Sequence, residues 1–486
     1  MKRLSPVRFA VLAAGWLAVL VTALFLRVND LGERPFHADE ATGARLTALR
    51  MENTGGDFNP THFHGPLLGD VAAVVCRVRG ENGWPEMTKG SLRLLPVAAG
   101  LLLALVPIVG RKRFGDGAMW LAGAFIACSP LLVVYSRMFI HEMLLTLFGT
   151  LFVLVLGKRG TSWLPGLLLG LMYATKETVV ISVLAWAGAA ACVLWPQRRK
   201  WRQTAVRWWR PVVLNIAVAA VVALAFYTRG FTHWRGAVDA LMTFFTYETT
   251  AGHMKPAQYY LRLLAWPVKS AGMYWYGTPV VVLAGWAAWR ALRDRWAWGQ
   301  FLALSTLGHL AIYSFIGYKT PWLMCLPWAH VCLLAGTAVR GKGPARTAAW
   351  TVAIFTLATQ AWQAKKITGR IESDPHNPYA YVPTRRDVET LTAWLVEMKK
   401  TLPLEPLAVV GKDIWPLPWY LRDFRTGYWQ TLPADAAELP VLLILPDVPA
   451  TANLAKTHVA LPRGLRDGVP LMVFLRNDLW EQWNRQ

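Results

Sequence analysis

The stretch PFHADEA, residues 35–41, stands a few residues beyond the apolar segment FAVLAAGWLAVLVTALFL, residues 9–26. The apolar segment is long enough to cross a bilayer as a helix. No small-residue cleavage site follows it, so we interpret it as a retained membrane anchor. Asp39 and Glu40 place two adjacent carboxylates in the polar, turn-rich loop that comes next. This order predicts a membrane protein with an acidic first loop.

The composition of the chain agrees with a membrane location. Hydrophobic residues make up 55% of the 486 residues and charged residues 16%, whereas a soluble protein carries about 25% charged residues. The net charge is +22, but the basic residues fall in short clusters between apolar runs, which is typical of cytoplasmic loops. The long apolar runs exclude a nucleic-acid-binding protein. The five cysteines are scattered, so neither a disulfide framework nor a zinc site is predicted.

The apolar runs predict a polytopic helical domain over residues 1–363, embedded in a lipid bilayer, with a first outer loop at 27–91. The protein is expected in the cytoplasmic (inner) membrane. The basic clusters place its N-terminus on the cytoplasmic side and its C-terminus on the outer side. The segment 67–78 is too short to span, and we predict that it is an interfacial helix. About eleven spans are predicted, at Phe9–Leu26, Leu92–Gly110, Ala118–Tyr135, Met143–Leu156, Trp163–Ala174, Val179–Trp195, Val212–Tyr227, Tyr276–Leu292, Phe301–Ile316, Leu323–Val339 and Ala348–Trp362.

The character of the chain changes at residues 364–486, where no run is long enough to span a bilayer. The segment Arg385–Lys399 has apolar residues at helical spacing. Short apolar runs bounded by Pro and Gly predict strands. These runs are Leu407–Val410, Val441–Leu445, Val459–Leu461 and Leu471–Leu475. We therefore predict a small α/β domain outside the membrane.

Charged residues recur at the outer ends of the predicted spans. They include Asp39, Glu40, Arg137, Glu142, Lys176, Glu177, His253 and Lys319. Carboxylates can act as a general base or bind a divalent cation, whereas Lys and Arg can hold a phosphate. For any one of these residues the alternative is a solvated loop side chain. For the acidic pair, the alternative is that it caps a helix beginning near Ala41.

Several blocks of residues resemble one known superfamily. The blocks are His37–Ala41, Phe63–Leu68, Tyr135–Arg137 with Glu142, Lys176-Glu177 and the aromatic stretch Trp415–Arg422. Together they resemble the GT-C superfamily of polyprenyl-phosphate-dependent glycosyltransferases. Within it, the chain looks most like the dolichyl-phosphate-mannose-protein mannosyltransferase-like family, whose archaeal members are called flippase-activity-associated. The aromatic stretch has two interpretations, a sugar platform or a packing surface.

The resemblance implies roles for individual residues. Asp39 would be the essential first-loop acid with Glu40 as its partner, and Glu142 would be the second acidic site. Lys176 resembles a lysine that approaches the donor phosphate in some relatives, and our own interpretation adds Arg137 and Lys319 as phosphate contacts. Supporting roles fall to His37, His64, Glu177 and His253. Metal use varies within the superfamily, so a divalent cation, Mg²⁺ or Mn²⁺, is compatible with Asp39 and Glu142. The chain lacks the Trp-Trp-Asp block of oligosaccharyltransferases.

The resemblance implies an inverting glycosyltransferase of the hexosyltransferase type. It would move a sugar from a polyprenyl-phosphate donor to an acceptor on the outer face of the membrane. The acceptor is left open between protein, lipid and glycan. One alternative is a translocase for lipid-linked sugars, which would need polar groups through the bilayer midplane. A second alternative is a non-catalytic accessory protein of surface-glycan assembly, which would not need an acidic residue at position 39.

Overall fold

The computed structural model describes residues 5–52, 58–157, 163–246, 252–369, 371–449 and 454–486. The chain divides into two compact units. The helical unit comprises Met1–Leu31, Asp57–Val74 and Arg93–Gly369, and the α/β unit comprises Gly32–Gly56, Val75–Leu92 and Arg370–Gln486. Two segments of the predicted first loop therefore cluster with the C-terminal residues. The domain boundary predicted at residue 363 stays a prediction.

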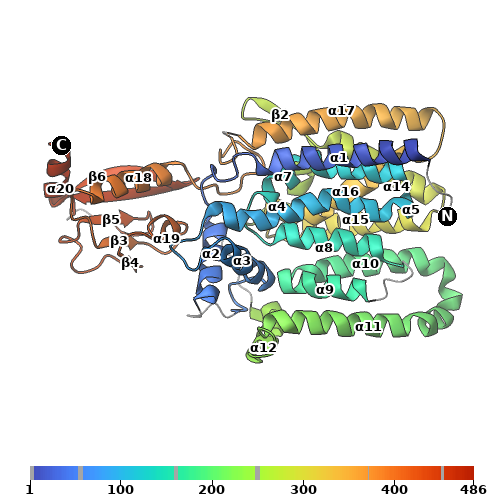
Figure 1. The fold of residues 1–486 in the computed structure, drawn as a ribbon, viewed down its shortest axis with the longest axis horizontal. Coiled ribbons are helices and arrows are strands. Elements are labelled where there is room, and N and C mark those ends of the chain that lie inside the picture. Colours follow the sequence, from blue (N-terminus) through green and yellow to red (C-terminus); the bar gives the residue numbers. More distant parts are fainter. Residues whose placement is uncertain (1–4, 53–57, 158–162, 247–251, 370, 450–453) are drawn as a thin grey trace. The chain divides into compact units, whose positions relative to one another are not determined.

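Helices make up most of the helical unit, and many of them run along a common direction (Figure 1). In chain order the described helices up to residue 227 are α1 (Pro6–Val28), α2 (Ala38–Met51), α3 (Leu67–Val78), α4 (Lys89–Leu105), η1 (Val106–Gly110), α5 (Arg111–Phe114), α6 (Asp116–Cys128), α7 (Pro130–Ser136), α8 (Glu142–Val155), α9 (Leu164–Thr175), α10 (Val179–Leu194), η2 (Trp195–Lys200) and α11 (Trp201–Tyr227). They are followed by α12 (Arg235–Thr246), α13 (Tyr259–Leu264), the hairpin β1 (Val268–Ser270) and β2 (Met273–Trp275), α14 (Thr278–Arg293), α15 (Ala297–Phe315), η3 (Pro321–Met324), α16 (Cys325–Gly336), η4 (Thr337–Val339) and α17 (Pro344–Ile367).

A helix occupies each of the eleven segments for which a span is predicted. Among the described residues, four helical stretches are long and apolar enough to cross a membrane, or five if the bent pair α6–α7 counts as one span. The four are Pro6–Val28, Lys89–Phe114, Trp208–Tyr227 and Pro321–Val339. Large apolar side chains remain exposed along α1 and α11, which suits a lipid environment. The chain is a multi-pass membrane protein, and the count of eleven spans stays a prediction.

The bend between α6 and α7 has an identifiable cause. The two helices meet at 61°, where Pro130 lacks the N–H that would bond the carbonyl of Ile126. The fully buried guanidinium of Arg27 donates to the carbonyls of Ile126, at 3.1 Å, and Ala127, at 2.9 Å. A side chain on α1 therefore satisfies the backbone groups that the proline leaves open.

A five-stranded mixed sheet forms the centre of the α/β unit. Its strands are β3 (Leu407–Val410), β4 (Thr426–Trp429), β5 (Val441–Ile444), β6 (His458–Arg466) and β7 (Val469–Arg476). Besides α2, the unit contains the helices α18 (Asp387–Lys399), α19 (Leu417–Tyr420), α20 (Asn477–Asn484) and the short η5 (Leu454–Lys456). The strand order is β4-β3-β5-β7-β6. β3 pairs in parallel with β4 and β5, whereas β7 is antiparallel to β5 and β6.

The two central strands β3 and β5 are buried at every position, as expected when both faces of a sheet are covered. One apolar cluster of the unit joins Ala408, Val410, Ala436, Leu439, Leu442, Ile444, Leu454 and Phe474. The buried side chains of α18 are Val388, Leu391, Leu395 and Met398. All four strands predicted from apolar runs are present. The sequence analysis missed β4. This strand consists of Thr426 and Gly427 followed by the exposed aromatic residues Tyr428 and Trp429.

Candidate functional site

The predicted acidic pair lies in the first turn of α2, in the α/β unit. The helix begins at Ala38 and its N-cap is His37, whose ring nitrogen Nδ1 accepts a hydrogen bond from the Asp39 amide at 3.1 Å. The helix thus begins three residues before Ala41, and the interpretation that the acidic pair caps it is confirmed for Glu40 but not for Asp39. Glu40 completes a capping box, because its carboxylate accepts from the His37 amide at 3.0 Å. Asp39 does not cap the helix.

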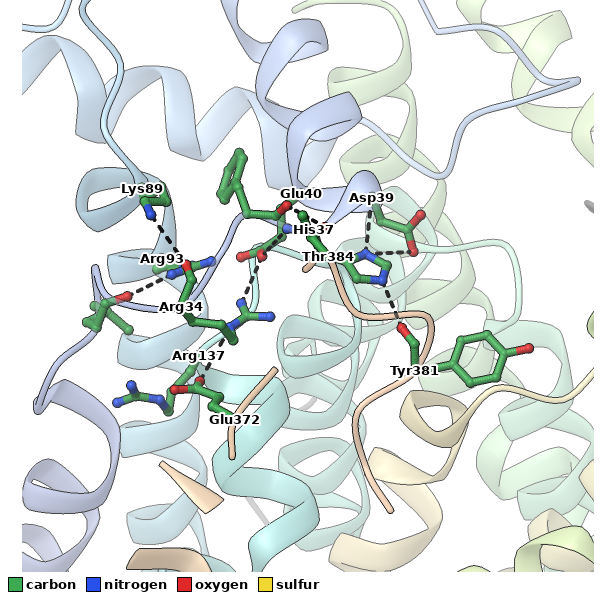
Figure 2. A network of polar contacts seen from close by, with 12 residues as sticks. Arg34, His37, Asp39, Glu40, Lys89, Arg93, Arg137, Glu372, Tyr381 and Thr384 are labelled. Carbon is green, nitrogen blue, oxygen red and sulfur yellow. Dashed lines mark hydrogen bonds and ion pairs between the residues drawn. The ribbon is translucent and has the colours of Figure 1, made fainter. Parts of the chain in front are cut away.

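Glu40 is fully buried and belongs to an ion-paired network (Figure 2). Its Oε2 accepts from Arg34 Nη2 at 2.8 Å. Arg34 Nε also lies 3.4 Å from Glu372 Oε1, and both of these side chains are almost completely buried. The negative charge of Glu40 is therefore matched by a neighbouring cation, and this carboxylate holds the start of α2 in place.

Asp39 presents a different environment, since 53% of its side chain is exposed. His37 Nε2 donates to the Tyr381 carbonyl at 2.9 Å, which fixes the tautomer and leaves Nδ1 as an acceptor. The 3.8 Å approach of Asp39 Oδ2 to that Nδ1 is consequently not an ion pair with a charged imidazole. Burial and the charge of Asp39 raise the pKa of Tyr381. Of the two predicted acids, Asp39 has the carboxylate that solvent and a ligand can reach.

Two further predicted residues meet in the helical unit. Lys176 Nζ lies 2.6 Å from Glu142 Oε1, and the two side chains are 4% and 5% exposed. Glu142 stands in the first turn of α8, and Lys176 directly follows the last turn of α9. Each charge thus has the sign that its helix end favours. The lysine predicted to bind the donor phosphate is already paired with the predicted second acidic site.

A histidine–carboxylate pair lies beside this ion pair. His64 Nδ1 and Glu177 Oε2 are 3.0 Å apart, and the His64 ring packs edge-on against His141 with centroids 5.2 Å apart. Burial alone would raise the pKa of Glu177, but the neighbouring His64 and Lys176 lower it to about 2. Burial, followed by the charges of His64 and Lys176, lowers the pKa of His141 well below its usual value. The carboxyl of Glu177 therefore loses its proton more readily, and the imidazole of His141 gains one less readily, than each group does in water.

Lys319 and His253 are brought together by a short antiparallel contact. The Lys319 amide donates to the His253 carbonyl at 3.0 Å, and the Lys255 amide donates to the Gly317 carbonyl at 3.1 Å. The Lys319 side chain is 1% exposed, and its ammonium donates to the carbonyl of Ile316. Within the described part of the chain, no carboxylate forms a salt bridge with it. Lys319 is therefore a buried cation that a carboxylate does not balance.

Arg137 is buried as well, but its contacts differ from those predicted. Its guanidinium donates to the carbonyls of Arg27, Asn29 and Asp30 at 3.0, 2.6 and 3.2 Å. These carbonyls belong to the C-terminal end of α1 and the residues after it, where helical hydrogen bonding stops. The contacts support a structural role in anchoring that end of the helix, and they lend no support to a phosphate-binding role.

The aromatic stretch Trp415–Arg422 packs within the α/β unit. Trp419 is 5% exposed, and its ring centroid lies 4.3 Å from that of Phe36 and 5.4 Å from that of Trp84. The guanidinium of Arg422 stacks 4.0 Å from the Trp419 centroid. The Phe36 amide also donates to Tyr420 Oη at 2.7 Å. Of the two interpretations of this stretch, these contacts favour the packing surface.

The described residues contain no group of three His, Cys, Asp or Glu side chains placed to hold a metal ion. The sequence analysis missed two residues of these networks, Arg34 and Glu372, whereas His141 belongs to the charged residues expected at the outer ends of spans. Arg34 lies six residues before Glu40, and a basic residue so near in sequence is a usable signal. Glu372 lies more than three hundred residues away in sequence, and nothing in its local context indicates the contact.

Comparison with protein-family models finds no match for the chain, and comparison with curated proteins finds none either. Solved structures do match. The crystal structure of ArnT from Cupriavidus metallidurans in the apo state has a TM-score of 0.67 at 17% identity, and the match covers 96% of this chain and 99% of that one. The structure of the same protein bound to undecaprenyl phosphate has a TM-score of 0.64 at 16% identity, with the same coverage.

A further match is the archaeal oligosaccharyltransferase AglB from Archaeoglobus fulgidus, in complex with an inhibitory peptide and a dolichol-phosphate. Its TM-score is 0.59 at 12% identity, and 91% of this chain and 70% of that one are covered. A structure of the Archaeoglobus fulgidus oligosaccharyltransferase in complex with Zn and sulfate gives a TM-score of 0.51 at 12% identity, covering 89% and 68%. The chain therefore shares its fold with ArnT and AglB. The finer resemblance to the mannosyltransferase-like family stays a prediction.

Proposed function

We propose that the chain is a membrane glycosyltransferase that takes a sugar from a polyprenyl-phosphate donor and transfers it to an acceptor outside the cytoplasmic membrane. The observation that carries the proposal is the buried ammonium of Lys319. A lysine removed from water is costly unless an anion accompanies it. Phosphate is the anion that the proposed donor supplies, and lysine binds it as a point charge. The fold shared with ArnT and AglB, both solved with polyprenyl-type phosphates bound, supports the same donor class.

Lys176 and Arg137 are weaker candidates for the phosphate contact. The charge of Lys176 is matched by Glu142 at 2.6 Å, and Arg137 donates to three backbone carbonyls. A phosphate would have to displace these partners, whereas Lys319 has no carboxylate to displace in the described chain. The proposal therefore gives Lys319 the main phosphate contact and gives the pair of Lys176 and Glu142 a supporting role in the same unit.

Asp39 is the proposed general base. Its carboxylate is half exposed and is not held in a salt bridge with a lysine or arginine in the described residues. In the reaction, Asp39 takes the proton of the acceptor hydroxyl or amide as the acceptor forms its bond to the anomeric carbon. The bond from that carbon to the phosphate oxygen breaks, and polyprenyl phosphate leaves with the electron pair. A cationic side chain bound to the phosphate stabilises the negative charge that develops on the leaving group. A single displacement of this kind inverts the anomeric centre.

A divalent cation at Asp39 and Glu142, considered from the sequence, does not fit the contacts well. Glu142 is engaged by the Lys176 ammonium, and the described residues assemble no three-ligand set. No step of the proposed reaction uses a divalent cation. Activity after chelation, with and without added Mn²⁺ or Mg²⁺, tests metal dependence directly.

The test of the proposed function uses the full-length protein purified into lipid nanodiscs. A panel of radiolabelled polyprenyl-phosphate sugars is added with membrane extract as the source of acceptor, and transfer or release of the sugar is measured. Lys319→Met should lose most of the activity, and Lys255→Met, a lysine on the paired segment, serves as the matched control. Failure of every donor in the panel, or equal activity of the two variants, would contradict the proposal. Movement of intact donor across proteoliposomes without transfer would favour the translocase.

A further inference from the structure

We propose that α12 lies on the membrane surface and inserts its outward apolar stripe into the lipid. The stripe consists of Trp234, Val238, Leu241 and Phe245, which stand at or beside the helix at intervals of four, three and four residues. That spacing puts them on one face of a helix. Each of the four side chains is more than half exposed, and Phe245 is 82% exposed. Four neighbouring large apolar side chains on one helical face need an apolar partner.

The opposite face of α12 already has its partners within the helical unit. Ala240 packs with Phe58 and Tyr227, and its carbonyl accepts a hydrogen bond from Tyr173 Oη at 2.6 Å. Thr243 Oγ1 donates to the Pro60 carbonyl at 3.3 Å. Since this inner face fixes the rotation of the helix, the stripe cannot turn inward to be buried. The apolar stripe must therefore be covered by something other than the segments that pack on the inner face of α12.

The position of α12 indicates that this partner is lipid. The preceding helix, α11, contains the spanning stretch Trp208–Tyr227, of which only 6% is buried inside the protein, so lipid surrounds most of it. Only residues 228–234 separate the end of α11 from the start of α12. Figure 1 shows α12 turning away from the direction of α11, as a helix lying in the plane of the bilayer would do. The lipid-facing surface of α11 is thereby continuous with the stripe.

The polar residues of α12 agree with this orientation. Arg235 and Asp239 form an i,i+4 pair at 3.9 Å, and 82% of the Arg235 side chain is exposed. By helical geometry Arg235 points about 90° from the centre of the stripe, whereas Asp239, whose side chain is 17% exposed, points about 130° from it, towards the packed face. Trp234 stands at the start of the helix, and indoles favour the headgroup level of a bilayer. The helix thus has a packed face, an exposed apolar stripe and one exposed charged side chain, Arg235, at the border between them, which suits an interfacial helix.

Anchoring α12 in the membrane surface would also fix how deep the nearby His64–Glu177 pair lies relative to the bilayer. Tyr173 lies on α9 just before Lys176 and Glu177, and Pro60 lies just before His64. Both segments are bonded to α12 through the Tyr173 hydroxyl and the Pro60 carbonyl. A helix anchored in the interface would hold the His64–Glu177 pair close to the level of lipid headgroups.

The experiment measures the depth of single probes. In a Cys192→Ser background, which removes the exposed one of the five cysteines, cysteines replace Val238, Leu241 or Arg235 and are labelled with the fluorophore NBD. The full-length protein is placed in nanodiscs of phosphatidylcholine and phosphatidylglycerol. Doxyl-labelled lipids should quench the probes at Val238→Cys and Leu241→Cys severalfold more than the probe at Arg235→Cys, and iodide should show the reverse order.

Two results would overturn the proposal. Iodide quenching at both stripe positions as strong as at Arg235→Cys would place the stripe in water. Resistance of both stripe positions to doxyl lipids and to iodide alike would mean that protein covers the stripe. Two stripe positions are used so that one poorly folded variant does not decide the outcome, and unchanged thermal unfolding of each labelled protein confirms that it is folded.

Discussion

The buried pair of Glu142 and Lys176 allows a quantitative test of the helical unit. Lys176→Met keeps the length of the side chain and removes the ammonium. Glu142, which is only 5% exposed at its side chain, then retains a buried charge without its cation at 2.6 Å. Leaving one member of such a pair unpaired costs about 3–5 kcal/mol. The positive N-terminal end of α8 stabilises the carboxylate by about 0.3–1 kcal/mol. We therefore expect the free energy of unfolding to fall by an amount near the lower end of the range of about 3–5 kcal/mol.

The double-mutant cycle isolates the pair from its surroundings. Glu142→Gln removes the other charge, and the double variant Glu142→Gln/Lys176→Met removes both. The loss of unfolding free energy in the double variant should be smaller than the sum of the losses in the two single variants. The difference, which is the coupling energy of the pair, should be about 2–3 kcal/mol. The assay is unfolding in mixed detergent micelles, followed by circular dichroism, with the free energy extrapolated to zero denaturant.

An exposed ion pair provides the matched control. Arg8 and Asp116 lie 3.0 Å apart with 62% and 26% of their side chains exposed, and such pairs contribute about 1 kcal/mol or less. Asp116→Asn should therefore change stability little. Single losses at Glu142 and Lys176 that match the control and simply add together would refute the assignment of a strongly coupled buried pair.

Three further variants test other parts of the account by the same unfolding assay. Glu40→Gln keeps the capping box but removes the charge that pairs with Arg34, so we expect a loss of about 1–3 kcal/mol; a neutral result would contradict the structural role of Glu40. Because burial lowers the pKa of His141 below 6.5, the unfolded chain binds more protons there, and stability should fall as pH drops below 6.5. His141→Gln should flatten that slope by up to about 1.4 kcal/mol per pH unit, and an unchanged slope would refute the cause. Ser129→Ala removes the N-cap of α7 and the acceptor of the Trp328 indole at 2.9 Å, so a loss of about 1–2 kcal/mol is expected; full stability would argue against this cap.

The sequence predicts the elements well where the signal is local. Apolar runs mark the helices of the helical unit and the strands β3, β5, β6 and β7, because hydrophobic periodicity depends on neighbouring residues. The strand β4, Thr426–Trp429, escapes that signal, since it lies at the edge of the sheet and its aromatic side chains are exposed. The bend between α6 and α7 follows from Pro130, whose effect on a helix is also local.

Pairings between residues far apart in the sequence cannot be predicted in this way. The sequence analysis selects Glu142 and Lys176 separately, but it does not show that one neutralises the other, because the contact depends on how α8 and α9 pack. The same holds for Arg137, which the sequence suggests for a phosphate and the structure directs to the carbonyls at the end of α1. It also holds for the acidic pair, in which burial distinguishes Glu40 from Asp39 although the two are adjacent.

The central claim is that Asp39 is the base of a sugar transfer, and one variant tests it most directly. Asp39→Asn removes the charge at an exposed position that does not cap α2, so stability should stay within about 0.5 kcal/mol of the wild type. The rate of sugar transfer from the polyprenyl-phosphate donor should fall by about 10²–10⁴, the usual contribution of a positioned base. Rate and thermal unfolding are measured on the same nanodisc sample. A stable Asp39→Asn protein that transfers sugar at the wild-type rate would contradict the account.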